Sequence, residues 1–130
     1  MHDRPADIAD KSAIILSGLC IVHCLLPILL SLIVPYLAGL AFLTDEAFHL
    51  WTMIFIVPIS AFAIGWGYYQ HRNSVILTLA LVGLSMIIVA ATVGHDLLGH
   101  TYEVMITVVG SLFVVYGHIK NIQLRKNLLM

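Results

Sequence analysis

The amino-acid sequence predicts an all-α integral membrane protein, a compact bundle of four transmembrane helices. Of its 130 residues, 61% are hydrophobic and only 10% are charged, and the mean hydropathy is +1.02. Soluble domains do not have this balance. The apolar residues form four runs, each about the 20 residues needed to cross a hydrocarbon core about 30 Å thick. These runs leave no room for a separate soluble domain, so we expect a single membrane domain over residues 1–130.

Each apolar run predicts one helix. The first is expected at about residues 12–35, after Lys11, and the second at about 49–69. The third is expected at about 74–93 and the fourth at about 102–119. Charged and turn residues separate the runs, as they do where short loops join membrane helices.

The basic residues predict how the bundle is oriented. They flank the N-terminus, the loop between the second and third helices, or the C-terminus: Arg4, Lys11, Arg72, Lys120, Arg125 and Lys126. By the positive-inside rule, both termini and this loop are cytosolic, and the loops around Asp45 and Asp96 face the opposite side. The net charge of −1 gives no reason to expect nucleic acid as a partner.

One face of the first helix carries unusual chemistry for a membrane segment. At 100° per residue, Ser17, Cys20, His23 and Cys24 share this face. Counted from the start of the apolar run, the two cysteines lie roughly 10–17 Å deep in the bilayer. Pro27 has no N–H to bond the carbonyl four residues earlier, which is that of His23, and it predicts a kink there. The site therefore offers two sulfurs, an imidazole and a freed carbonyl oxygen.

The spacing of the cysteines favours a metal over a disulfide. Side chains at i and i+4 have Cβ atoms about 5–6 Å apart, whereas a disulfide needs about 3.5–4.5 Å. A metal held about 2.3 Å from each sulfur spans the longer distance. Two thiolates select soft ions, such as Hg(II), Cu(I) or Zn(II). The alternative is that Cys20 and Cys24 pack as small apolar residues and that His23 forms a hydrogen bond across the bundle.

Several segments resemble the MerC family of mercury-resistance membrane proteins. The most specific is the first-helix pattern from Cys20 and His23-Cys24 to Pro27. The others are Asp10-Lys11-Ser12-Ala13, Phe48-His49-Leu50-Trp51, Gly67 with His71-Arg72, Gly110-Ser111-Leu112, and His118 with Asn121. The resemblance implies a multi-pass protein of the bacterial inner membrane that takes up Hg(II) and passes it toward a cytosolic reductase. It makes Cys20 and Cys24 the membrane thiols, with His23 beside them.

The sequence departs from that family pattern at its C-terminal end. Mercury-transporting members carry further cysteines there, whereas this chain has none after Cys24. The metal then leaves directly to a cytosolic thiol acceptor, or the protein is a membrane metal-binding or sensing protein for Zn or Cu without net transport. We expect no tightly bound cofactor. We also expect no enzyme, because no nucleophile-base motif is present.

The remaining histidines suggest two further roles. A second, extracytosolic metal site could form from His49, His95, Asp96 and His100, whose alternative is a set of solvated loop residues. Near the cytosolic end, His118 could lie on the release path of the metal or reach the membrane interface instead. His71 in the cytosolic loop is expected at the surface.

The fourth helix also has a narrow face of small residues. Its members are Thr107, Gly110, Val114 and Gly117. Small residues allow close helix approach in lipid, so this face predicts packing within the chain or in a homo-oligomer.

Overall fold

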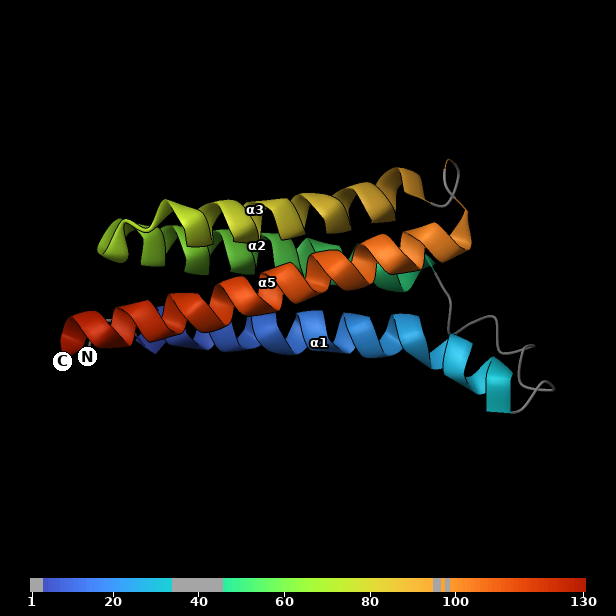
Figure 1. The fold of residues 1–130 in the computed structure, drawn as a ribbon, viewed down its shortest axis with the longest axis horizontal. Coiled ribbons are helices and arrows are strands. Elements are labelled where there is room, and N and C mark those ends of the chain that lie inside the picture. The colour runs from blue at the N-terminus through green and yellow to red at the C-terminus, as the bar shows by residue number, and fades with distance from the viewer. Residues whose placement is uncertain (1–3, 34–45, 95–96, 98) are drawn as a thin grey trace.

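A bundle of long antiparallel helices makes up the protein (Figure 1). The computed structural model describes residues 4–33, 46–94, 97 and 99–130, with the side chains of 27, 28, 30–33, 46–50, 94, 100 and 129 left aside. The helices are α1 (Arg4–Ile33), α2 (Glu46–His71), α3 (Ser74–Val89), the short π-helical segment η3 (Ala90–Gly94) and α5 (His100–Leu129). Within these described residues, four spans are long and apolar enough to cross a membrane. The predicted all-helical membrane fold is confirmed.

Two helices reach further than the apolar runs predict. Helix α1 begins at Arg4 instead of near residue 12, and α5 continues to Leu129 instead of ending near 119. The prediction began the first helix just after a charged residue and ended the fourth just before one, because charges usually lie outside the hydrocarbon core. In the structure, Asp10 and Arg125 from these extensions are buried and paired with each other, so the helices continue through them.

Helix α5 occupies the middle of the bundle and contacts α1, α2 and α3. Both chain termini and the turn between α2 and α3 lie at one end, on the left of Figure 1. We call this the terminal end, and the other the opposite end. All six Lys and Arg residues belong to the terminal end by their place in these helices and that turn. The charge pattern in the sequence therefore corresponds to one end of the fold.

The turn between α2 and α3 is only two residues long. Arg72 adopts a left-handed conformation, with φ of 52°, and its N–H donates to the carbonyl of Tyr68 at 2.9 Å. Asn73 then caps α3, because its side-chain oxygen accepts from the N–H groups of Val75 and Ile76. This cap satisfies donors that a helix start leaves without partners.

Small residues bring α3 and α5 into close contact. A Cβ added to Gly110 would lie 2.8 Å from the carbonyl oxygen of Gly83, and one added to Gly117 would lie 3.2 Å from the Cβ of Ala80. The small-residue face of the fourth helix therefore packs within the chain, as one of the two expectations had it.

The bundle hides its polar side chains and exposes its apolar ones. On α1, Ile15, Leu19 and Val22 are exposed, while Asp10 and Ser17 are fully buried. This distribution suits a lipid environment, which solvates apolar groups and leaves polar groups to find partners inside the protein.

Candidate metal site and buried polar cluster

The two cysteines lie side by side in the interior of the bundle. Neither is in a disulfide, and Cys20 and Cys24 are 3% and 4% exposed. Each contacts the same part of α5, where Val104 and Val108 pack against them. Their i, i+4 spacing on the continuous helix α1 turns both sulfurs toward α5. The structure thus provides the paired, unbridged thiols that the sequence predicts.

Helices α2, α3 and α5 complete the surroundings of the pair. Ser111 lies beside Cys20, and the buried carboxyl group of Glu103 lies near Cys24. A cavity of about 10 Å³ adjoins Cys20, which is about the space that one water molecule needs. It is lined by Cys20, Thr52, Met53, Ile56, Ile87, Ala91 and Thr107. The space next to the thiol is therefore small and mostly apolar.

The thiol pair lies in the half of the bundle away from the termini. The cavity that adjoins Cys20 also adjoins Ile87. The third span runs from Ser74 to Val93, and Ile87 lies closer to its Val93 end. At 1.5 Å per residue, Ile87 is about 20 Å from the start of α3. The pair is thus well inside the membrane span but closer to the opposite end.

His23 is half-buried on the same helix. Among the residues that the structure describes, no three His, Cys, Asp or Glu side chains come together as metal ligands. The described part of the site therefore offers the two thiols as a pair, without His23 as a third ligand in this conformation. The backbone of α1 continues through residue 27, and its last turns bend away from the bundle (Figure 1).

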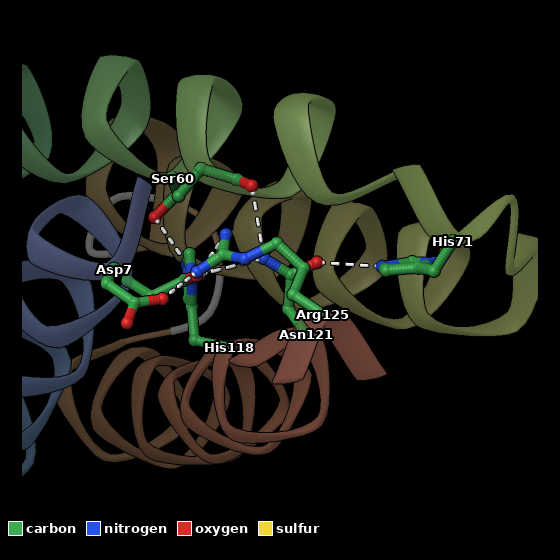
Figure 2. Close-up of polar contacts among 8 residues, drawn as sticks. Asp7, Ser60, His71, His118, Asn121 and Arg125 are labelled. Carbon is green, nitrogen blue, oxygen red and sulfur yellow. Dashed lines mark hydrogen bonds and ion pairs between the residues drawn. The ribbon is translucent and has the colours of Figure 1, made fainter. Parts of the chain in front are cut away.

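A second polar group fills the bundle core closer to the terminal end. His118 is fully buried on α5, and its Nδ1 lies 2.5 Å from Oδ1 of the equally buried Asp10. The other ring nitrogen, Nε2, lies 3.1 Å from Oγ of Ser60 on α2 (Figure 2). Because its exposed fraction is 0%, His118 does not reach the membrane interface. That alternative is wrong, since burial with two partners replaces contact with water.

Ionic contacts connect His118 and Asp10 to charged residues near the two ends of the chain. Arg125 Nη2 donates to Oδ1 of Asp7, and Nη1 lies 2.8 Å from Oδ2 of Asp10. Asn121 Nδ2 donates to both carboxylate oxygens of Asp10 at 3.0 Å and to the carbonyl of Ala63. We name Asp7, Asp10, Ser60, His118, Asn121 and Arg125 the polar cluster; it joins α1, α2 and α5.

His71 connects the polar cluster to the α2–α3 turn. Its Nε2 lies 2.9 Å from Oδ1 of Asn121 (Figure 2). Its Nδ1 accepts from the N–H of Asn73 at 3.0 Å. An amide oxygen only accepts, so Nε2 carries the hydrogen and Nδ1 has the free lone pair. His71, expected at the surface, is partly buried, because its contacts with Asn73 and Asn121 draw its ring toward the bundle.

The sequence contains a signal for the polar cluster that the helix predictions did not use. His118, Asn121 and Arg125 are at i, i+3 and i+7, and Asp7 and Asp10 are at i and i+3. Each set lies on one face of a helix. Reading the charged residues as helix-flanking groups hid this pattern.

The predicted second metal site lies outside the described residues. His95 and Asp96 belong to the part of the chain left undescribed, and the side chains of His49 and His100 do as well. His49 belongs to α2 and His100 begins α5. The proposal of this site therefore stays a prediction.

Ser60, His118 and Asp10 also follow the order of a nucleophile, a base and an orienting carboxylate. Ser60 is nevertheless buried in the middle of α2, and its neighbours enclose it within the bundle. Catalysis needs a substrate atom next to the nucleophile, which this packing does not admit. We therefore interpret the three residues as part of a buried network that connects helices.

The fold and the thiol pair define a multi-pass membrane protein with two buried cysteines side by side in its interior. The family model described as "MerC mercury resistance protein" matches residues 10–123. The chain therefore belongs to the MerC family of mercury-resistance membrane proteins, as the sequence motifs indicated. No curated protein and no solved structure matches it. The matched range includes the thiol pair as well as Asp10, His118 and Asn121.

Proposed function

We propose that this protein takes up mercuric ion across the bacterial inner membrane through Cys20 and Cys24, with both termini in the cytosol. The observation that carries the proposal is the pair of buried thiols, not joined by a disulfide, on one turn of a membrane helix. Membership of a mercury-resistance family supports Hg(II) as the ion. The basic residues at the terminal end support its cytosolic location.

Charge balance explains why two thiols suit Hg(II). When Hg(II) binds, each thiol loses a proton and forms one metal–sulfur bond, so two protons leave and a neutral dithiolate complex remains. A neutral complex avoids the cost of an isolated charge in an apolar surrounding. Cu(I) at the same two thiolates would leave one negative charge. Zn(II) prefers four ligands, and the described residues around the pair do not supply a third.

Release must proceed without a second thiol pair in the chain. No cysteine follows Cys24, so the next thiol ligand comes from a cytosolic acceptor. An incoming thiolate can replace a bound thiolate at the metal, because soft ions favour sulfur ligands. The imidazole of His23 and the carbonyl that Pro27 frees could hold the ion weakly during this exchange. His118, between the thiols and the terminal end, lies on the side to which the ion must leave.

Metal binding by purified protein tests the proposal directly. We expect the wild type to bind about one equivalent of Hg(II), because it has one thiol pair. Cys20→Ser and Cys24→Ser should each abolish this binding. Thr78→Ser changes an exposed residue of α3 and is the control for the effect of mutation and purification as such. It should bind Hg(II) like the wild type. Unchanged Hg(II) binding by the double cysteine variant would reject the site.

The absence of a later thiol pair favours one second candidate, a protein that binds or senses metal without moving it. Uptake into vesicles, normalised to folded protein, separates the two. We expect flux in the wild type, and a severalfold lower flux in His23→Ala and Pro27→Ala with stoichiometric binding retained. No flux in the wild type would favour the binding protein, and equal flux in all three would reject a role in exchange for His23 and Pro27.

A further inference from the structure

We propose that the ionic contacts of Arg125 with Asp7 and Asp10 form a gate that closes the terminal end of the ion path. In this conformation the thiol pair would then communicate only with the opposite end. This inference rests on the proposed function, because it concerns how an ion held by Cys20 and Cys24 leaves. It assigns a transport role to residues that otherwise only join helices.

The first observation is a line of buried polar groups through the bundle core. On α1, Asp10, Ser17, Cys20 and Cys24 all face the interior. The antiparallel helix α5 places Ser111 beside Cys20 and His118 against Asp10. Polar side chains therefore extend from the thiol pair to the polar cluster without leaving the core.

Ser17 occupies the stretch between the thiols and the polar cluster. It is fully buried, and its Oγ has no hydrogen-bond partner among the described residues. Buried hydroxyls in folded proteins are nearly always bonded, and an exception calls for an explanation. A hydroxyl next to the path of an ion, or of water that accompanies it, has a partner when the path is in use.

The second observation is that the polar cluster closes this line at the terminal end. Arg125 is 1% exposed and contacts both aspartates, while Asp7 is 32% exposed and is the outermost member. Asn121 and His118 tie Asp10 to α2. The buried guanidinium and its two carboxylate partners fill the core between α1 and α5 here, so an ion that moves from the thiols toward the termini meets a closed, bonded contact (Figure 2).

The third observation is that the gate is incompletely bonded. Arg125 Nε is buried and has no hydrogen-bond partner in the described part of the chain. Asp7 is partly exposed, so water competes for its carboxylate. A closed state with an unused donor and one solvated partner is easier to open than a fully bonded buried pair. Opening would let a cytosolic thiol reach the metal, so that this thiol can replace a bound cysteine as ligand.

Sided labelling of the native cysteines tests the gate without any metal. The probe is a small, membrane-impermeant cationic methanethiosulfonate, applied to full-length protein in right-side-out and in inverted membrane vesicles. Intact-protein mass gives the modification rate of Cys20 and Cys24. In the wild type we expect modification at least about tenfold faster from the opposite end than from the terminal end.

Arg125→Gln should raise the terminal-side rate about tenfold or more and leave the opposite-side rate unchanged, because it removes the charge that holds the gate. Lys126→Gln, an exposed neighbour on α5, is the matched control and should label like the wild type. Asp7→Asn changes a partly exposed partner, so it should fold and raise the terminal-side rate by a smaller factor. If Arg125→Gln does not fold, the terminal-side rate of Asp7→Asn tests the gate.

Equal labelling of the wild type from both sides would overturn the gate. So would unchanged terminal-side rates in a folded Arg125→Gln and in Asp7→Asn. Hg(II) binding measured on the same wild-type preparation keeps the two proposals apart. Binding without sided labelling rejects the gate alone, whereas sided labelling without binding rejects the proposed function.

Discussion

Replacing Gly67 by alanine tests how tightly the polar cluster is packed. A Cβ at this position of α2 would lie 1.9 Å from Oδ1 of Asn121, and 2.6 and 2.7 Å from its Cγ and Nδ2. These distances are far below contact, so Asn121 must move. It then loses its bonds to Asp10, to the carbonyl of Ala63 and to His71.

The size of the effect follows from three contributions. Forcing a methyl group into a packed core costs about 1–3 kcal/mol, and leaving buried polar groups unsatisfied costs about 1–3 kcal/mol more. Alanine regains about 1 kcal/mol over glycine inside a helix. We therefore expect Gly67→Ala to lower the free energy of unfolding by about 3 kcal/mol.

Gly65→Ala is the matched control for this substitution. It lies on the same helix, and a Cβ there would have nothing within 4 Å. Its change should be stabilising and about 1 kcal/mol or less. Reversible unfolding of both purified variants in mixed detergent micelles, followed by far-ultraviolet circular dichroism, gives the comparison. Equal stabilities of the two variants would refute the reasoning.

A double-mutant cycle isolates the clash itself. In an Asn121→Ala background the side chain that Gly67→Ala would strike is absent, so Gly67→Ala should cost at least about 1 kcal/mol less there than in the wild type. An identical cost in both backgrounds would show that Asn121 does not occupy the space above Gly67.

Three further predictions concern the helix contacts and the topology. Gly110→Ala should destabilise the protein by about 1–3 kcal/mol because its Cβ meets the backbone oxygen of Gly83, and more than Gly117→Ala, which meets a side-chain carbon; equal unfolding free energies would contradict this. Asn73→Ala should cost about 1 kcal/mol through the lost cap of α3 in the same assay, and no loss would show the cap to be dispensable. Met130→Cys, in a background without the native cysteines, should react with an impermeant thiol reagent only in inverted vesicles, whereas reaction in intact spheroplasts would reverse the topology.

The sequence by itself determined the membrane character of the protein and the face of α1 that carries the thiols. Both depend on local quantities: the length of an apolar run and the angle between neighbouring side chains on a helix. Cys20 and Cys24 are four residues apart, so their common orientation follows from helical geometry alone. The structure keeps them side by side, buried and without a disulfide.

Only the tertiary structure decided that Asp10 and Arg125, charged residues near the two termini, belong to the interior. Asp10 and His118 are 108 residues apart, and Asp7 and Arg125 are 118 apart, so the packing of α1 against α5 brings them together. A lone charge in a membrane helix is costly. A prediction that takes each residue separately therefore leaves these charged residues outside the helices. The cost falls when an opposite charge on a neighbouring helix lies within contact distance. That distance is a property of the bundle and of neither helix alone.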